Sequence, residues 1–378
     1  MKNAHPLLGQ LSSGEFLRTY WQRRPLLVRQ AVPGFAGTLA KRALFALAAG
    51  DGAESRLIER RPEWRVTPGP IGSRALSRLP ARDWTLLVND VNLHSQGADA
   101  LLRQFAFLSW ARLDDVMVSY ATDGGGVGPH VDSYDVFLLQ GPGRRKWRLM
   151  PLQRRPFGLV PGAPLKLIAR FRPTLEMTLE PGDMLYLPPG WGHDGIAIGE
   201  CQTYSIGMRA PGGEELSAAF LDFLHERGFD ALGFRDPGRT PAASPARIDG
   251  HMIAHAVRSL ERIRWNRTDA ARFLGRYLSE PRQQVVFEAP RPPKLRAHFM
   301  RLLPRSRVTL DPRTRMLTHG TRLYINGIEV PAPAGSLAAM QALADRRELD
   351  GMRLAHSGMA ELIFEWYTHG FLSLGSPR

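Results

Sequence analysis

The chain has 378 residues, of which 43% are hydrophobic and 23% charged, so it is large enough for two or three globular domains. No stretch is long and apolar enough for a membrane helix, and the single cysteine, Cys201, excludes an intramolecular disulfide. The net charge is +14, with only five lysines among the 50 basic residues.

The basic charge leaves two interpretations open. A strongly basic surface favours a polyanion nearby, such as nucleic acid or a ribonucleoprotein. The same composition arises when arginine is simply abundant and solvated, because net charge alone does not identify a partner. The N-terminal residues MKNAHPLLGQLSSGEF contain no secretory signal, and the lone cysteine fits a reducing compartment. We therefore expect a cytoplasmic protein with no membrane partner.

The N-terminal part of the chain predicts helices and loops, and strands follow. Residues 13–60 are helical and mixed in character, with SSGEF as a helix start, and the Arg-, Pro- and Gly-rich residues 61–80 predict a loop. From Trp84 onward, short apolar runs alternate with glycine and proline, a pattern typical of a β-sandwich or barrel. LQGPGRRKW predicts a β-hairpin that turns at 141–143, and EPGD predicts a turn at 180–183. The runs are TLLVNDV, MVSYA, VFLLQ, WRLM, LEMTL, MLYLP and QTYSIGM.

The strand pattern stops after about residue 212. Apolar residues then recur at helical spacing from Met252 to Ile263, and this stripe is better suited to a partner helix than to solvent. We expect a homodimer through residues of about 215–290, with packing inside one chain as the alternative. Residues 235–247 and 289–294 predict linkers. Beyond 300 the chain mixes short strands, an Asn326-Gly327 turn and helical patterns at 335–347 and 357–368.

Three residues form a candidate metal site. His130 and Asp132 are two positions apart on a predicted strand, so both side chains point to the same face and can bind one cation. His193 in PPGWGHDG follows a strand and a turn and offers the third ligand. Two histidines and a carboxylate form the facial triad of non-haem Fe(II) oxygenases, which leaves positions open for a bidentate co-substrate and dioxygen. An isolated HxD pair arises by chance, but the glycine-rich residues before it and the distal histidine favour the metal.

Arg145 adds an independent argument. It shares a strand face with Trp147 and Leu149, which should point inward, so its guanidinium needs an anionic partner inside the barrel. The distal carboxylate of 2-oxoglutarate would supply that partner, and an internal Asp or Glu is the alternative. If the strand register were off by one, Arg144 or Lys146 would become the candidate. Two serines on neighbouring strands could donate further hydrogen bonds to the co-substrate, although both also fit ordinary strand positions: Ser119 and Ser205.

The motifs that carry these residues resemble the JmjC-type ribosomal oxygenases, in particular bacterial members that hydroxylate an arginine of a large-subunit ribosomal protein. The similar stretches are GGGVGPHVDSYDVFLLQGPGRRKWRL, EPGDMLYLPPGWGHDG, YSIGMRAP and, near the N-terminus, YWQRRPLLVRQAVPGF. The resemblance is specific at about 85–212, weaker at 15–36 and only architectural beyond 215.

The resemblance implies a mixed α+β chain built on a double-stranded β-helix, the jelly-roll cupin core of JmjC proteins. It implies that His130, Asp132 and His193 are the iron ligands, that Arg145 anchors 2-oxoglutarate and that Ser119 supplies a co-substrate hydroxyl. No substrate-binding residue is carried over. The implied parts are an N-terminal segment packing on the barrel (1–84), the catalytic domain (85–212), a helical dimerisation region (213–295) and a winged-helix-like domain (296–378).

The resemblance also implies a function. With Fe(II), 2-oxoglutarate and dioxygen, the chain would hydroxylate C3 of an arginine side chain on a ribosomal protein, close to ribosomal RNA. Two alternatives remain. The first is an oxygenase of the same fold that acts on histidine or on a nucleic-acid base. The second is a nucleic-acid-binding regulator with an inert barrel, against which the intact triad and the inward Arg145 argue, because an inert barrel has no reason to keep a buried charge.

Overall fold

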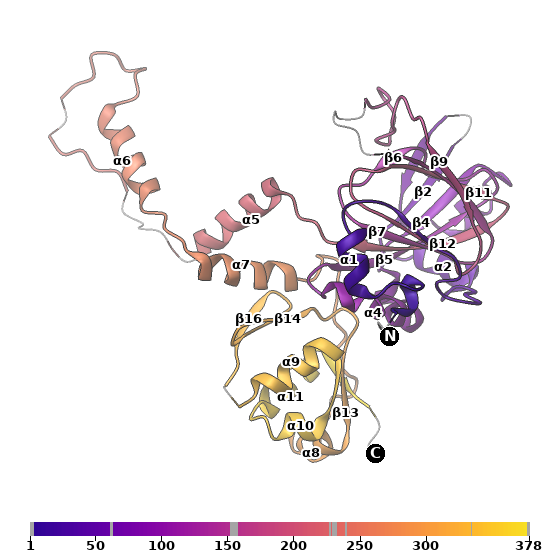
Figure 1. The fold of residues 1–378 in the computed structure, drawn as a ribbon. Helices are drawn as coiled ribbons and strands as arrows, with labels where there is room; N and C mark the ends of the chain where they lie inside the picture. Colours follow the sequence, from indigo (N-terminus) through magenta and orange to yellow (C-terminus); the bar gives the residue numbers. More distant parts are fainter. Residues whose placement is uncertain are drawn as a thin grey trace. The chain divides into compact units, whose positions relative to one another are not determined.

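The computed structural model describes residues 4–60, 63–151, 158–226, 228, 233–238, 240–333 and 335–375. The chain forms two compact units (Figure 1). The first comprises Met1–Ala210, Arg282–Ala289 and Asp311–Arg313, and the second comprises Pro211–Pro281, Pro290–Leu310 and Thr314–Arg378. Among the described residues, no helix is long and apolar enough to cross a membrane.

Two antiparallel sheets form the first unit. One has the order β1 (Leu26–Val28), β10 (Met184–Leu187), β7 (Val136–Gln140), β12 (Cys201–Met208), β5 (Leu113–Ala121), β4 (Trp84–Val88), β2 (Ser55–Glu59) and β3 (Arg65–Pro68). The other has the order β6 (His130–Val131), β11 (Gly192–Ile198), β8 (Arg144–Met150) and β9 (Leu175–Leu179). This is the double-stranded β-helix expected from the sequence.

The alternation of side chains along the strands explains the packing of the sheets. In β7, Val136 and Leu138 lie in the apolar cluster between the sheets, together with Trp147 of β8. Phe137 faces the other way and packs against Phe16 of α1. The helices of this unit are η1 (Pro6–Leu8), α1 (Ser13–Thr19), α2 (Lys41–Ala48), α3 (Ser73–Leu76), η2 (Val91–Leu93), α4 (Gln96–Arg103) and η3 (Ala106–Leu108).

Helix α1 begins where SSGEF predicts it. The Ser12 side chain accepts from the backbone N–H of Glu15, and the Glu15 carboxylate accepts from the backbone N–H of Ser12. This reciprocal capping box satisfies N–H groups that the first helical turn leaves unpaired.

The predicted hairpin at 141–143 is wrong. The turn exists, but β7 pairs with β10 and β12 whereas β8 pairs with β9 and β11, so the turn carries the chain from one sheet to the other. Gly143 has φ 77°, and a Cβ there would lie 2.0 Å from the Glu200 carbonyl oxygen, so glycine is required at this crossing. A turn of this composition fits both connections, and burial of the apolar faces between two sheets decides against local pairing.

The loop expected at 61–80 is partly wrong as well. Strand β3 pairs with β2 at the edge of the larger sheet, and α3 follows it, whereas residues 61–62 lie outside the described residues. The side chains of β3 are mostly exposed, so the strand carries no apolar alternation that the sequence could reveal.

The second unit begins with three helices, α5 (Gly213–Glu226), α6 (Gly250–Glu261) and α7 (Arg267–Ser279). Neither expected linker forms a helix or strand where it is described; within 235–247, residue 239 lies outside the described residues. Between β15 and β16, Asn326 and Gly327 both have positive φ, as a two-residue hairpin turn requires. The other elements are α8 (Arg296–Leu302), η4 (Leu303–Arg305), β13 (Arg307–Leu310), β14 (Met316–His319), β15 (Arg322–Ile325), β16 (Ile328–Pro331), α9 (Leu337–Arg346), β17 (Glu348–Asp350), α10 (Gly351–Ala355), α11 (Ala360–Thr368) and β18 (Leu372–Leu374).

Candidate metal centre

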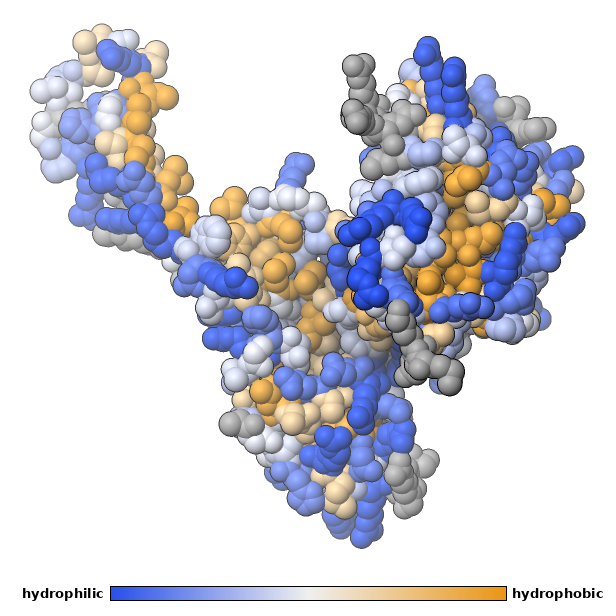
Figure 2. Space-filling view, viewed as in Figure 1, coloured by the Kyte–Doolittle hydropathy of each residue, from blue (hydrophilic) through white to orange (hydrophobic). Residues whose placement is uncertain are grey.

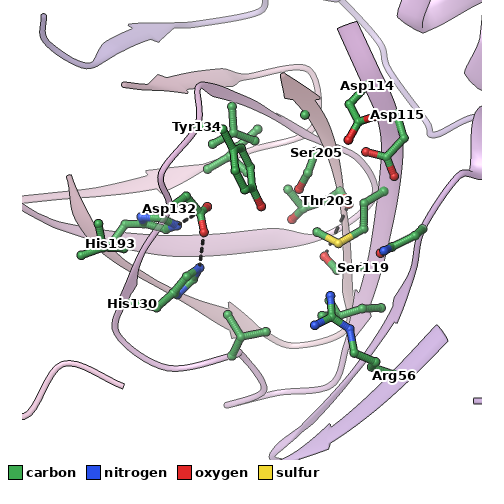
Figure 3. A pocket seen from close by; sticks show the side chains of 18 of the residues that line it. Arg56, Asp114, Asp115, Ser119, His130, Asp132, Tyr134, His193, Thr203 and Ser205 are labelled. Atoms are coloured by element: carbon green, nitrogen blue, oxygen red, sulfur yellow. Dashed lines mark hydrogen bonds and ion pairs between the residues drawn. The ribbon is translucent and has the colours of Figure 1, made fainter. Parts of the chain in front are cut away.

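The structure brings His130, Asp132 and His193 together. One ligand atom from each lies within 4.8 Å of the others. The Asp132 carboxylate approaches both rings, with Oδ1 3.8 Å from His130 Nε2 and Oδ2 3.6 Å from His193 Nε2 (Figure 3). The sequence placed His193 after a strand, but it lies within β11 and pairs directly with His130 of β6. The β-ladder itself therefore sets the spacing of the two rings.

Backbone carbonyl groups orient both histidines. His130 Nδ1 lies 2.9 Å from the Gly128 carbonyl oxygen, and His193 Nδ1 lies 3.0 Å from the Trp191 carbonyl oxygen. A ring that donates Nδ1–H to a carbonyl leaves the lone pair of Nε2 free for a metal. Burial, and next the neighbouring His130, hold the pKa of His193 below its ordinary value, so this ring is neutral at pH 7. The donor set fits a divalent transition metal.

The three residues line one side of a pocket with a volume of about 390 Å³. In Figure 3 the carboxylates of Asp114 and Asp115 lie across this pocket from the triad. Met117, Tyr134 and Trp147 supply apolar walls between them. The pocket therefore has a metal-binding side and an acidic side.

Arg145 points into the same pocket, as its strand face predicts. The residue is 4% exposed, whereas Arg144 is exposed and Lys146 pairs with Glu176 at a half-exposed site. Its Nη2 lies 3.6 Å from Cys201 Sγ, and its buried Nε has no hydrogen-bond partner. No carboxylate of the described residues forms an ion pair with Arg145. The alternative partner of Arg145, an internal Asp or Glu, is therefore not observed among the described residues. Its guanidinium remains available to an anion.

Hydroxyl groups extend from the larger sheet into the pocket. Ser119 on β5 and Ser205 on β12, both singled out from the sequence, line the pocket. Thr203, also on β12, lines it as well. Thr203 Oγ1 lies 3.2 Å from Gln140 Oε1, and Ser119 Oγ lies 3.4 Å from the Thr203 carbonyl oxygen. Thr203 was not singled out, although its two-residue spacing from Ser205 was a signal that could have found it.

The acidic side of the pocket was also not predicted from the sequence. Asp115 is buried, and its Oδ2 accepts from the backbone N–H of Asp90 at 3.0 Å. Burial first, and then the carboxylates of Asp114 and Asp90, raise the pKa of Asp115 to about 7. Arg282 lies between Asp90 and Asp114. These residues are far apart in the sequence, so no spacing could have joined them.

Comparisons with known proteins agree with this geometry. A JmjC domain model matches residues 100–216, and a ROXA-like winged helix model matches residues 262–373. The ribosomal protein uL16 3-hydroxylase of Escherichia coli (strain K12) is 32% identical over 333 residues, covering 87% of this chain and 88% of that protein. The solved structure of YcfD, a ribosomal oxygenase from Escherichia coli, in complex with cobalt and 2-oxoglutarate matches with a TM-score of 0.80 at 29% identity, covering 97% of this chain and 99% of that one. The JmjC core and the winged helix expected from the sequence are thus confirmed.

Proposed function

The chain belongs to the JmjC-type ribosomal oxygenases and is a 2-oxoglutarate-dependent oxygenase, and on this premise we propose that it hydroxylates C3 of an arginine side chain on a large-subunit ribosomal protein. The related Escherichia coli enzyme is a 3-hydroxylase of ribosomal protein uL16, which supports the substrate class. An enzyme with this substrate would work in the cytoplasm. The division at about residues 84, 212 and 295 remains part of this proposal, and the start of the second unit at Pro211 supports the boundary near 212.

The observation that carries the proposal is the acidic side of the pocket. Asp114, Asp115 and Arg282 line the pocket there. Arg282 pairs with Asp114 and with Asp90, and Arg209 Nε lies 3.7 Å from Asp114 Oδ1. Asp115 lines the pocket without an ion-pair partner among the described residues, so it can receive one cationic side chain, and a guanidinium binds a carboxylate through charge-assisted hydrogen bonds. A neutral histidine or a nucleic-acid base, the alternative substrates, would leave that charge unpaired in a buried place.

The remaining residues fit the roles that the family implies. His130, Asp132 and His193 would hold Fe(II), which, when bound, supplies the oxidative chemistry with 2-oxoglutarate and dioxygen. Arg145 would take the distal carboxylate of 2-oxoglutarate, because it is a buried guanidinium without an acidic partner. Ser119 and Ser205 would donate hydrogen bonds to the same molecule. The apolar walls exclude water from the reacting carbon.

Mass spectrometry tests the reaction directly. Ribosomal proteins are incubated with the enzyme, Fe(II) and 2-oxoglutarate, and we expect one protein to gain one oxygen on an arginine. An oxygen found on a histidine or on RNA would instead support the alternative substrates. If no ribosomal component gains oxygen while 2-oxoglutarate is consumed, the proposed substrate class is wrong.

The affinity for a cationic substrate should rise with pH. Because the pKa of Asp115 is about 7, its carboxyl is partly protonated at neutral pH and becomes fully anionic above that value. Asp114, Asp90 and Arg282 are the charged groups around it, and the pKa of Tyr134 is raised, so Tyr134 does not ionise in this range. The KM for an arginine peptide should fall between about pH 6 and pH 8. The Asp115→Asn variant should bind weakly with no such slope, and a slope that persists would assign the titration to another group.

We propose that the helical region forms a homodimer through α6. None of its described residues is buried, and Ile253, Val257 and Leu260 are 52%, 46% and 66% exposed. Figure 2 shows the resulting hydrophobic band along α6. Wide apolar helix faces require cover, and these side chains are exposed in a single chain.

Sedimentation checks the dimer. The wild-type chain, of 42.2 kDa, should sediment as a dimer at micromolar concentration. Val257→Asp with Leu260→Asp should give a monomer because two charges would enter an apolar interface. The control adds the same charges to exposed positions on the other side of α6, with His251→Asp and Ser259→Asp, and should remain dimeric. A monomeric wild type would refute the proposal.

We also propose that ribosomal RNA contacts the segment Pro290–Leu310. This segment contains six basic residues and no acidic one. Lys294, His298, Arg301 and Arg305 recur at spacings of four, three and four. His298 and Arg301 are exposed on α8, which buries Phe299; Lys294 precedes this helix and Arg305 is exposed in η4. Such a stripe fits a phosphate backbone, because arginines there neutralise phosphates and release counterions.

Salt-dependent RNA binding tests this stripe. Arg301→Glu with Arg305→Glu should weaken binding of single-stranded RNA and lower the slope of log Kd against log salt by about 0.7 for each lost phosphate contact. Arg74→Glu with Arg78→Glu changes the net charge equally at exposed positions in and just after α3 and should keep the wild-type slope. Equal losses in both variants would show that only the overall charge matters.

A further inference from the structure

The acidic side of the pocket depends on a residue that comes from far along the chain. Arg282 begins the segment Arg282–Ala289, which belongs to the first unit. Its Nη1 lies 2.6 Å from Asp90 Oδ2, and its Nη2 lies 2.7 Å from Asp114 Oδ2. Gln284 of the same segment donates to Asp90 Oδ2 at 3.3 Å. One guanidinium therefore ties together two carboxylates that the sequence separates by 24 positions.

Asp90 connects Arg282 to the carboxylate that faces the substrate. Asp90 has φ 56°, in the left-handed region that aspartate and asparagine adopt more readily than other residues with a side chain. Its side chain is held by Arg282 and Gln284, and its backbone N–H donates to Asp115 Oδ2. The orientation of Asp115 is thus linked, through Asp90, to the position of Arg282.

The carboxylates on the acidic side of the pocket differ in whether they form ion pairs. Arg282 forms ion pairs with Asp90 and Asp114, whereas Asp115 forms no ion pair with any described residue. Arg282 and Asp115 both line the pocket. Arg282 and Arg209 together pair with Asp90 and Asp114, so the Asp115 carboxylate is the group that remains to receive a singly charged cation.

We infer that Arg282 is a positioning residue for recognition of the cationic substrate: it forms ion pairs with Asp90 and Asp114 and holds Asp90 so that Asp115 receives the substrate guanidinium. The inference rests on the proposed function and extends it. The substrate end of the pocket is complete only with the segment Arg282–Ala289 in place, although that segment follows the last strand of the catalytic core by more than seventy positions.

Peptide kinetics with the full-length enzyme test this role. The probe is the ribosomal arginine peptide that the wild-type enzyme hydroxylates. Arg282→Gln should raise the KM for this peptide by about ten- to a hundredfold, because a charged hydrogen-bonding partner is lost, with the effect on KM rather than on kcat. Arg282→Lys keeps the charge and should recover part of the affinity. The control Arg313→Gln removes an arginine that pairs with Glu288 of the same segment and should keep the wild-type KM.

A double variant distinguishes two roles of Arg282. One is to offset the negative charge of Asp90, and the other is only to hold the segment Arg282–Ala289 against the barrel. Asp90→Asn removes a negative charge that Arg282 neutralises, and asparagine tolerates the left-handed conformation. If Arg282 acts as inferred, Arg282→Gln with Asp90→Asn should bind the peptide better than Arg282→Gln alone. A peptide KM unchanged in Arg282→Gln, or raised equally in Arg313→Gln, overturns the inference.

The two proposals fail in different ways. Binding of a short arginine peptide, compared with its alanine counterpart, is titrated onto the enzyme loaded with Mn(II) and 2-oxoglutarate. If no ribosomal protein is hydroxylated but this binding depends on Arg282, the proposed function fails and the inference stands. If ribosomal arginine is hydroxylated with no effect of Arg282 on KM or binding, the function stands and the inference fails.

Discussion

Replacing His130 or Asp132 with alanine should abolish 2-oxoglutarate turnover while the fold remains intact. Each side chain supplies one of three donor atoms that lie within 4.8 Å of one another, and two remaining ligands cannot define a facial site. His130 lies in the short strand β6 and Asp132 directly follows it; both are half-buried, so no core packing is lost. Succinate production measures turnover, and circular dichroism checks the fold.

A matched control sharpens this result. His94→Ala removes an exposed histidine whose Nε2 contacts only the Gly52 carbonyl oxygen in the described structure, and it should retain wild-type turnover. Because all three variants lose one polar side chain, the difference between them isolates the metal site. Succinate formed at the wild-type rate by either triad variant would contradict the assignment of that residue as a metal ligand.

Replacing Arg145 with methionine should raise the KM for 2-oxoglutarate steeply without removing the metal. A buried guanidinium paired with a carboxylate is lost, and breaking such a pair costs about 3–5 kcal/mol. At about 1.4 kcal/mol per tenfold, the affinity falls by about two to three orders of magnitude. Arg145→Lys should be milder, because the charge survives but the planar fork does not.

Two measurements distinguish anchoring from a general collapse of the site. The 2-oxoglutarate dependence of succinate production gives the KM, and titration of the metal-free enzyme with Fe(II) under exclusion of oxygen should give near wild-type affinity in both variants. Normal 2-oxoglutarate affinity in Arg145→Met would move the anchor to another cation of the pocket, Arg56 or Lys166. Arg144 and Lys146 do not line it.

The metal site and its anchor could be predicted because their signals are local. His130 and Asp132 share a strand face by two-residue spacing, and the same alternation places Arg145 beside Trp147. Both follow from the geometry of a single strand and need no knowledge of its neighbours. The apolar runs from Trp84 onward predicted the β-architecture for the same reason.

Features that depend on pairing partners were not predictable in this way. The turn at 141–143 has the composition of a hairpin, and only the pairing of β8 with β11 shows that it joins two sheets. The acidic side of the pocket brings together Asp90, Asp114 and Arg282, whose contacts span 192 and 168 positions. A single sequence contains no spacing rule for such contacts, because tertiary packing creates them.

The charged groups of the pocket come from two different sheets, and this separation affects how a new substrate could evolve. The triad and Arg145 all come from the four-stranded sheet, whereas Asp114 and Asp115 stand on β5 of the eight-stranded sheet. Mutations at Asp114 and Asp115 can therefore be sampled by selection while the proposed metal ligands and Arg145 stay unchanged. A lineage could exchange an arginine target for a neutral one by altering one strand. Descendants of one ancestor could thus retain the same chemistry and diverge in what they modify.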